Sequence, residues 1–541
     1  MKTIKKVLMS LLSILMTVSL VSCNSVETIK KEVNTAEGPY AGKTIILHSN
    51  DSHGTIEGFA NMAFVKKDFE SKGATVILVD DGDFTQGSIY VTTDKGKTVT
   101  EVLEKTGYDI VALGNHEFDY GFDQLKSNFE GKSYKVLCSN VTNENGTIFD
   151  SNAIFSVGDL KIGFFALLTP ETQTKVNPNY VKGFTFVEKN DLYDLAQKEI
   201  DNLKKSSDLV ICLGHLGVDD ESAGNRSLDV LAGTTGIDFF IDGHSHTVLE
   251  KGENGEKIQS TGANFENIGV IVIDNKTKTI ENNYLLSSEE TSPDNDLLDE
   301  IQTIVSKVDS EYGSVFANSE VELDGVKEHV RSYETNLGDL VADSMVWSVL
   351  KDGSIEVPDE NVLAITNGGG IRANIAKGGV TYKDINTVLP FGNTIAVDYI
   401  TGEELLEALE ASTFCTPEPV GGFPQVSGIK FTVNTLEKYD AGEEYPDSTY
   451  FAPKSIKRVT IDEVNGKPFD PSAKYAVVTN NFCAAGGDTY YSFLRAYSAG
   501  EGFDTGIVLD EALEDYITNE LGGVIGSQYE KAQERIMVAV K

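Results

Sequence analysis

The sequence predicts an α/β protein with two domains joined by a helix. In residues 43–290, short apolar segments alternate with polar loops and helical stretches, which is typical of a layered α/β domain. The stretch 291–320 carries apolar side chains at helical spacing, so we expect a linking helix there. Residues 321–541 have a second mixed α/β pattern with longer glycine-rich loops. The 541 residues also exceed what one hydrophobic core usually supports.

The first 22 residues have the pattern of an export signal. Lysines precede an apolar run over residues 7–20, which is too short to span a bilayer comfortably. The run ends in Leu-Val-Ser-Cys at 20–23, which resembles the lipobox of bacterial lipoproteins, so we expect Cys23 to become the lipidated first residue of the mature protein. A simple secretory signal is the alternative. Both alternatives predict an exported, extracytoplasmic protein, either at the cell surface or anchored to the membrane, with a flexible tether over residues 23–42.

The formal net charge of −39 limits the possible partners. Nucleic acid polymers and anionic membrane surfaces would be repelled, so we expect no nucleic acid partner and membrane contact only through the N-terminal lipid anchor. An anionic substrate needs local positive charge, which bound divalent cations provide. The four cysteines beyond Cys23 are isolated and predict no disulfide framework.

Residue types that bind metals gather where the expected strands of the first domain end. Open α/β sheets bind their ligands at such strand ends. The expected strands are 44–47, 75–79, 110–113, 209–213 and 239–241. Five of the seven histidines lie in the loops that follow them. These loops are Asn50-Asp51-Ser52-His53-Gly54, Asp81-Gly82-Asp83, Gly114-Asn115-His116-Glu117, Gly214-His215-Leu216-Gly217 and Asp242-Gly243-His244-Ser245-His246.

Metal chemistry explains these residue types. Neutral imidazole together with carboxylate suits Zn²⁺ or Mn²⁺, whereas cages of oxygen alone suit Ca²⁺ or Mg²⁺. The candidate ligands are too many for one tetrahedral ion but enough for two divalent ions bridged by one carboxylate. Such a pair of ions produces hydroxide at neutral pH and suits the hydrolysis of phosphate esters. The candidates are Asp51, His53, Asp83, Asn115, His215, His244 and His246.

One histidine in these loops remains for catalysis. His116 follows the candidate ligand Asn115 on the same turn and can reach toward a substrate, while Asp119 can hold its tautomer. We expect His116 to protonate the leaving group or to donate a hydrogen bond to the transition state.

These motifs resemble those of the 5′-nucleotidase family, which includes bacterial UDP-sugar hydrolase and mammalian ecto-5′-nucleotidase. The matching segments of the first domain are 46–54, 82–83, 86–88, 114–121, 214–215 and 243–246. The resemblance implies a four-layer α/β/β/α metallophosphatase domain followed by a mixed α/β nucleotide-binding domain. It also implies that Asp51, His53 and His246 hold one metal ion. Asn115, His215 and His244 would hold the other, with Asp83 as the bridge.

The second domain carries motifs that resemble the substrate-binding half of the same family. The matching segments are 331–338, 367–372, 389–393, 422–428 and 486–490. Asn367 and Gly370 precede Arg372 in a glycine loop that offers backbone amides beside a guanidinium, which suits phosphate. Phe423 and Tyr490 lie on glycine loops, and the resemblance implies that they stack on a nucleobase. Only Arg372 among the domain's arginines lies in a recognised substrate motif, so phosphoester hydrolysis is predicted more firmly than a nucleotide substrate.

The favoured function is a 5′-nucleotidase that releases phosphate from nucleoside 5′-monophosphates by attack of metal-activated hydroxide. A UDP-sugar or dinucleotide pyrophosphatase, or a 2′,3′-cyclic-nucleotide phosphodiesterase, would use the same metals on a different bond. A sulfur-compound hydrolase of similar plan is a more distant alternative. A non-catalytic surface binding protein would have a broken ligand set, whereas the set is complete in this sequence.

Overall fold

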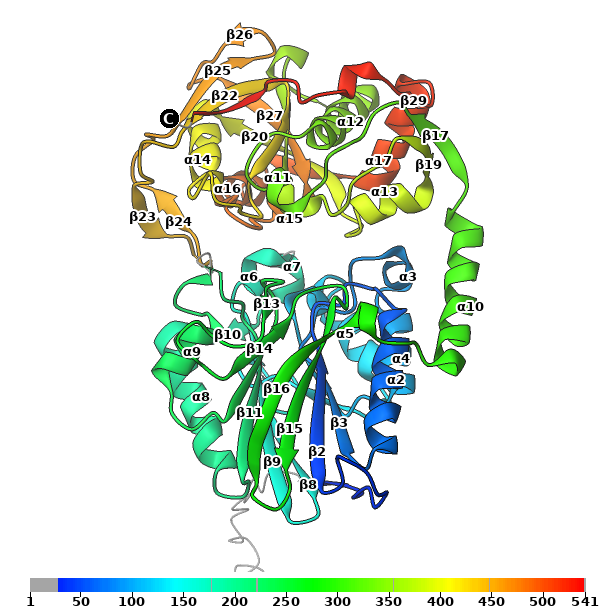
Figure 1. The fold of residues 1–541 in the computed structure, drawn as a ribbon. Coiled ribbons are helices and arrows are strands. Elements are labelled where there is room, and N and C mark those ends of the chain that lie inside the picture. The colour runs from blue at the N-terminus through cyan, green and yellow to red at the C-terminus, as the bar shows by residue number, and fades with distance from the viewer. Residues whose placement is uncertain (1–27, 177, 220–221, 354, 447, 540–541) are drawn as a thin grey trace, which may run out of the picture.

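The computed structural model describes residues 28–539 except 177, 220–221, 354 and 447. The chain forms two lobes, with the N-terminal domain below and the C-terminal domain above in Figure 1. The expected export signal and Cys23 lie outside the described residues. Within the described part of the chain, no helix combines the length and the apolar character that crossing a membrane requires.

Two sheets form the centre of the N-terminal domain. From edge to edge, the first contains β16 (Thr279–Ser287), β15 (Asn267–Asp274), β2 (Lys43–Ser49), β3 (Thr75–Asp80), β4 (Ile110–Ala112) and β5 (Lys135–Leu137). The second contains β1 (Thr28–Lys31), β8 (Asn152–Val157), β9 (Leu160–Leu168), β11 (Leu209–His215), β12 (Phe239–Asp242), β14 (Ile258–Thr261) and β13 (Val248–Leu249). The central strands are covered on both faces, which explains why β3 is buried at every position.

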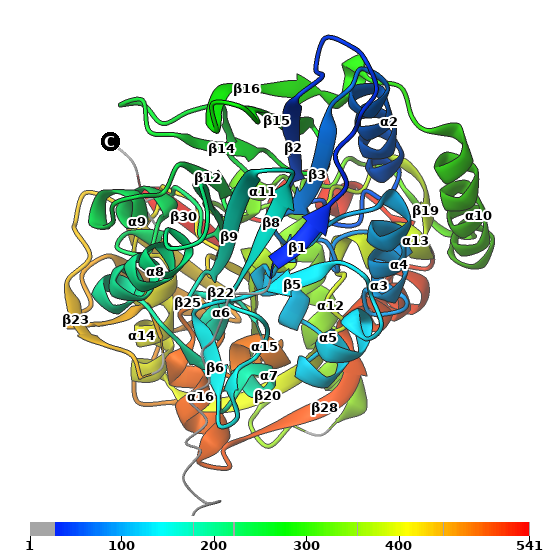
Figure 2. The same cartoon turned by 90° about the horizontal axis from the view of Figure 1, so that it is seen from below.

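Helices cover the outer face of each sheet. One outer layer contains α2 (Gly58–Ser71), α4 (Lys97–Thr106) and α5 (Phe122–Phe129), and the other contains α8 (Lys189–Leu203) and α9 (Ser227–Gly233). Figure 2 shows these two groups on opposite sides of the strands. A separate apolar cluster, which includes Ile46, Ile77 and Phe164, fills the space between the two sheets. The predicted four-layer α/β/β/α arrangement is confirmed.

The N-terminal segment differs from the expected tether over residues 23–42. The four residues of β1 pair in parallel with β8. Lys31 forms an ion pair of 2.6 Å with Asp109, and the Asn34 side chain donates a hydrogen bond to the Ala74 carbonyl at 2.8 Å. The prediction was therefore wrong for the described residues of this segment, because a polar stretch can still pair its backbone with an open sheet edge.

One helix connects the lobes within the stretch that we expected to link them. It is α10 (Asn295–Tyr312), which lies along the side of the molecule in Figure 1. The Asp294 carboxylate caps its start by accepting a hydrogen bond from the Leu297 amide at 3.1 Å. Leu297, Ile301 and Val305 lie on one face and pack into the core of the N-terminal domain.

The C-terminal domain has a five-stranded sheet between two helical layers. From edge to edge, its strands are β21 (Pro424–Ser427), β18 (Val362–Asn367), β27 (Lys474–Asn480), β20 (Thr394–Thr401) and β28 (Gly502–Val508). One layer contains α12 (Asn336–Asp352), α13 (Tyr382–Val388) and α17 (Leu509–Asp515), and the other α14 (Gly402–Ser412), α15 (Asn481–Ala484) and α16 (Tyr491–Ser498). A smaller sheet contains β26 (Lys467–Pro468), β25 (Val459–Val464), β22 (Ile429–Asn434) and β30 (Ile536–Ala539).

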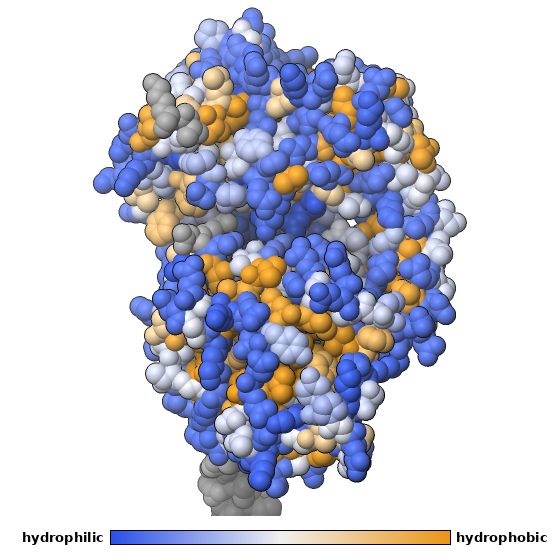
Figure 3. Space-filling view, in the orientation of Figure 1, coloured by the Kyte–Doolittle hydropathy of each residue, from blue (hydrophilic) through white to orange (hydrophobic). Residues whose placement is uncertain are grey.

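Polar contacts join the two lobes. Lys189 at the start of α8 forms an ion pair of 2.6 Å with Glu444 of the C-terminal domain. Thr92 donates a hydrogen bond to the Asn386 side chain at 3.1 Å. Among the described residues, no hydrophobic core cluster contains side chains from both domains. Each domain therefore has its own apolar core, and hydrophilic and hydrophobic residues lie side by side at the waist of the molecule in Figure 3.

Candidate metal centre and substrate cavity

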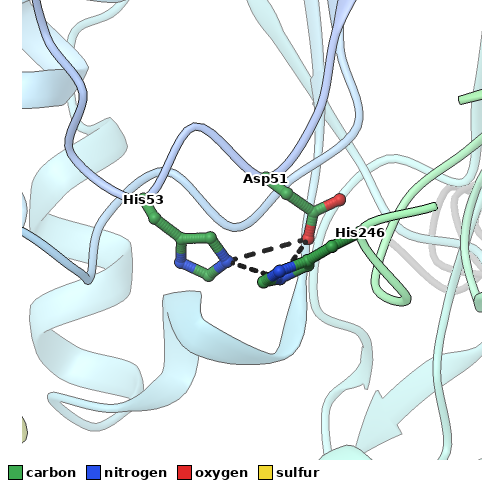
Figure 4. A group of neighbouring side chains, drawn as sticks. All are labelled: Asp51, His53 and His246. Carbon is green, nitrogen blue, oxygen red and sulfur yellow. Dashed lines mark hydrogen bonds and ion pairs between the residues drawn. The ribbon is translucent and has the colours of Figure 1, made fainter. Parts of the chain in front are cut away.

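The first group of predicted metal ligands comes from the loops after β2 and β12. Asp51 Oδ1 lies 3.9 Å from His53 Nε2 and 3.5 Å from His246 Nε2, and the two Nε2 atoms are 2.9 Å apart. Figure 4 shows these three side chains pointing toward one another. Burial lowers the pKa of both imidazoles well below the usual range, so both remain neutral. Neutral imidazoles beside a carboxylate are the donor set that a borderline divalent cation prefers.

The second group lies beside the first. His215 Nε2 is 3.1 Å from Asp83 Oδ2, and His244 Nδ1 is 2.9 Å from Asn115 Oδ1. His215 Nε2 also lies 4.0 Å from Asp51 Oδ1, which links the two groups. The candidate ligands from five separate loops are thus brought together at one place.

The second group also fits a metal ion chemically. His215 Nδ1 donates a hydrogen bond to the Asp81 carbonyl at 2.6 Å, so Nε2 is the ring nitrogen that is left to face Asp83. Burial lowers the pKa of His215, but the charges of Asp83 and Asp51 outweigh burial and raise it well above the usual range. This position therefore attracts positive charge, which a divalent cation would supply.

The backbone of the candidate ligands is strained. Five of them have a positive φ, which side chains other than glycine rarely adopt: Asp51 (49°), His53 (43°), Asp83 (59°), His244 (77°) and His246 (58°). Such conformations cost about 1–3 kcal/mol each and persist only where the surrounding structure holds them. Five of the seven candidate ligands therefore depend on the surrounding structure to hold their backbone conformation.

Glu117 holds two of the ligand loops, a role that the sequence analysis missed. Its buried carboxylate accepts hydrogen bonds from the amides of Gly114 (2.6 Å), Asp83 (2.9 Å), Phe84 (3.0 Å) and Thr85 (3.2 Å). The loops after β3 and β4 are thereby fixed to each other. Glu117 lies three residues after Gly114, the position from which a glutamate side chain accepts a hydrogen bond from the amide at the start of a helix, and this spacing is the sequence signal that would have indicated the role.

His116 lies at the edge of the two groups and faces the cavity. Its Nδ1 is 2.7 Å from Asp119 Oδ2, so Nε2 is left to face the cavity, 4.0 Å from Asp83 Oδ2. Burial lowers the pKa of His116, but Asp119 and Asp83 outweigh burial and raise it above the usual value. The imidazole also stacks on Phe391 of the C-terminal domain, with 5.7 Å between ring centroids. This arrangement suits a side chain that holds a proton at Nε2.

A cavity of about 750 Å³ lies between the lobes and is lined by both. The N-terminal domain contributes Asp83, Asn115, His116, Asp119, His244 and His246. From the C-terminal domain, the predicted residues Asn367, Gly370 and Arg372 line the opposite side. The sequence analysis missed further C-terminal residues that line the cavity, namely Lys327, Arg331, Phe414, Phe482 and Asp488.

The prediction that Phe423 and Tyr490 stack on a nucleobase was wrong. Both side chains are fully buried in a core cluster, and neither lines the cavity. The Tyr490 hydroxyl donates a hydrogen bond to the Gly422 carbonyl at 2.7 Å, and its ring stacks on Phe493. Glycine neighbours leave room for an aromatic ring to face a ligand. In this domain, however, the rings of Phe423 and Tyr490 pack into the core.

Aromatic side chains other than Phe423 and Tyr490 face the cavity. Phe414 and Phe482 are aromatic residues that face the cavity from the C-terminal domain. Asp488 lines it as well, and its carboxylate accepts a hydrogen bond from the Asn367 side chain at 2.9 Å. Arg331 lines the cavity together with Arg372, so Arg372 is not the only arginine there. Phe482 and Asp488 flank the Gly486-Gly487 turn, which was the available sequence signal.

Two family models match the chain along its two domains. Residues 44–248 match the calcineurin-like phosphoesterase family, and residues 315–495 match the C-terminal domain of 5′-nucleotidases. The chain belongs to the 5′-nucleotidase family. As a member of this family, the enzyme is a metallophosphoesterase, and its fold and the two candidate ligand groups agree with that chemistry.

Relatives of this 5′-nucleotidase family member span both domains. The 5′-nucleotidase of Vibrio cholerae is 27% identical over 574 residues, which cover 94% of this chain and 96% of that protein. The trifunctional nucleotide phosphoesterase protein YfkN of Bacillus subtilis is 28% identical over 550 residues, and the match covers 92% of this chain but only 35% of that protein. The structure of a 5′-nucleotidase precursor from Thermus thermophilus matches with a TM-score of 0.75 at 27% identity, covering 92% of this chain and all of that one.

Replacing Glu117 should weaken both ligand loops. Glu117→Gln keeps the shape of the side chain but removes the charge that four amides share, and we expect a loss of about 2–3 kcal/mol in the stability of the N-terminal domain. The melting temperature and the content of bound metal after dialysis should both fall. Glu130→Gln, an exposed carboxylate at the end of α5, is the control. Unchanged metal content in Glu117→Gln would mean that other contacts hold the ligand loops.

Proposed function

We propose that this enzyme is an extracytoplasmic 5′-nucleotidase that releases phosphate from nucleoside 5′-monophosphates. One observation carries the proposal: a single cavity combines the metal-ligand groups of one domain with the arginines and aromatic side chains of the other. Its volume of about 750 Å³ is within the usual range for small-molecule sites. The name of the Vibrio cholerae relative, a 5′-nucleotidase, supports the same substrate class.

The proposed metal site uses all seven candidate ligands. Asp51, His53 and His246 would hold one divalent ion, Asn115, His215 and His244 the other, and Asp83 would bridge them. Zn²⁺ or Mn²⁺ suits this mixed donor set. When bound, the two ions supply positive charge that polarises phosphoryl oxygens and lowers the pKa of water.

His116 is the proposed proton donor. The Asp119 carboxylate accepts a hydrogen bond from Nδ1–H of His116 and so fixes the tautomer, which leaves Nε2 directed toward the cavity. Its raised pKa favours a proton on the imidazole near neutral pH. A protonated Nε2 can give its proton to the leaving oxygen or stabilise the charge that develops there.

Different residues of the C-terminal domain suit different parts of the nucleotide. Arg331 and Arg372 suit the phosphate, because a guanidinium pairs well with phosphoryl oxygens. Phe414 and Phe482 suit the base, since aromatic rings stack on any nucleobase. Asp488 is the acceptor that can bind ribose hydroxyls, which are donors.

A second candidate is hydrolysis of a nucleotide pyrophosphate bond or of a 2′,3′-cyclic nucleotide. The Bacillus subtilis relative is described as a trifunctional nucleotide phosphoesterase, which favours a site that accepts more than one phosphoester. The same cavity residues would act on either bond, so product analysis is needed to separate the two candidates.

A substrate panel tests the proposed activity. Chelated enzyme should be inactive, and enzyme reconstituted with Zn²⁺, Mn²⁺, Co²⁺ or Mg²⁺ should release phosphate from nucleoside 5′-monophosphates with a higher kcat/KM than from UDP-sugars, dinucleotides or 2′,3′-cyclic nucleotides. Phe482→Ala should raise KM for the monophosphates about tenfold or more, because a stacked base is worth about 1–3 kcal/mol. Hydrolysis of other phosphoesters without the monophosphates would refute the proposed substrate.

Substitution of His116 tests the proton donor. His116→Gln should lower kcat by about 10²–10⁴-fold, because general acid catalysis contributes that much, while the bound metal remains unchanged. His329→Gln is a matched control, since His329 lies outside the cavity and pairs with Asp324. Full activity of His116→Gln would contradict the assignment.

The proposed location depends on the N-terminus. We propose that Cys23 is lipidated after removal of residues 1–22, which would hold the enzyme at the outer side of the membrane. Cells that express Cys23→Ala should release the enzyme from the membrane fraction into the soluble fraction. An unchanged membrane fraction would rule out the lipid anchor at this residue.

A further inference from the structure

A further strand end of the N-terminal domain carries an acidic residue that the proposed function does not use. β9 lies beside β11 in the second sheet, and Leu168 at the end of β9 pairs with His215. Glu171 follows three residues later and directly precedes α6 (Thr172–Lys175), at the end of the domain that faces the upper lobe in Figure 1. Only 3% of the Glu171 side chain is exposed, at the wall of the cavity. A buried carboxylate requires a polar partner, because the loss of its hydration is costly.

The partner of Glu171 is one of the candidate metal ligands. His244 Nε2 lies 3.2 Å from Glu171 Oε2, while Nδ1 of the same ring lies 2.9 Å from Asn115 Oδ1. A glutamate carboxylate accepts hydrogen bonds, so Nε2 is the donor of this pair and Nδ1 is left to face the second ligand group. Neither group of converging ligand atoms includes Glu171. Its carboxylate therefore lies behind the His244 ring, on the side away from the other ligands.

The backbone around Glu171 is fixed to the strand that provides the other histidine of this group. The Thr169 amide donates a hydrogen bond to the His215 carbonyl at 2.9 Å. The Thr172 hydroxyl donates a second to the Thr169 carbonyl at 2.7 Å, which closes the turn around Glu171. The carboxylate thus reaches His244 from a segment that β11 holds in place.

We propose that Glu171 is a positioning residue for the second metal ion, because it orients the His244 imidazole so that Nδ1 faces Asn115. A carboxylate that accepts the N–H of an imidazole also makes the opposite ring nitrogen a stronger ligand. His215 has a weaker counterpart of this support in the neutral Asp81 carbonyl. The proposal rests on the proposed metal site but not on the identity of the substrate. It predicts an effect confined to one of two ions, since His244 belongs to the second group only.

Titration of the metal-free protein with Zn²⁺ or Mn²⁺ tests this role without any substrate. The variants are Glu171→Ala and Glu171→Gln. Glu328→Ala is the matched control, because Glu328 is an exposed carboxylate that lines the same cavity from the C-terminal domain. Binding is followed by calorimetry, and metal content after dialysis and the melting temperature of the metal-free protein are measured on the same preparations.

Glu171→Ala should weaken one of the two ions by about 10–100-fold, which is the usual effect of removing a partner that supports a metal ligand. The affinity for the other ion and the melting temperature of the metal-free protein should stay the same, and Glu328→Ala should bind both ions as the unmodified protein does. Glu171→Gln should retain most of the affinity, because its amide oxygen can still accept the hydrogen bond from Nε2. In a His244→Ala background, Glu171→Ala should cause no further loss.

Three results would overturn the role of Glu171. They are unchanged affinity for both ions in Glu171→Ala, a similar weakening of both ions together with a lower melting temperature, and a further loss in the His244→Ala background. If the unmodified protein binds fewer than two ions, the proposed metal site fails and this proposal fails with it. Two bound ions without release of phosphate from nucleoside 5′-monophosphates would refute the nucleotidase proposal alone, and the Glu171 comparison would still be valid.

Discussion

Two of the loops that carry candidate metal ligands depend on one buried carboxylate that lies behind them. Glu117 accepts hydrogen bonds from four backbone amides and so ties the loop after β3 to the loop after β4. Without such a constraint, a residue other than glycine would leave the left-handed backbone conformation in which Asp83 is held. The cost of the strain is offset by interactions that lie behind the ligands. The donor atoms therefore converge before any ion binds, which reduces the reorganisation that binding requires.

The two domains contribute different side chains to the cavity. The lower domain supplies the imidazoles of the lining, and the upper domain supplies most of its cations and aromatic rings. Neither half forms the cavity alone, because its lining comes from both lobes. The ring contact between His116 and Phe391 joins the two lobes at the edge of this cavity. The cavity is therefore a property of the two-lobed arrangement and not of the N-terminal domain alone.

The sequence predicted local features well and distant convergence poorly. The strands and the loops after them could be predicted because each ligand motif directly follows its own apolar strand, as His53 follows β2 and His215 ends β11. The four-layer fold followed from the same alternation together with the family resemblance. By contrast, Phe414, Phe482 and Arg331 reach the cavity from separate elements, and only Phe482 has a local signal, the nearby Gly486-Gly487 turn. Phe423 and Tyr490 show the converse, since their glycine neighbours resemble a binding loop while their rings belong to the core.

The boundary between the lobes has an evolutionary consequence, because each lobe has its own apolar core. No apolar cluster of the described residues crosses that boundary, so exchange of the upper lobe by recombination would leave the packing of the lower lobe intact. Selectivity for a new phosphoester can then change without rebuilding the ion-binding loops. The same lower lobe can thus be combined with different upper lobes.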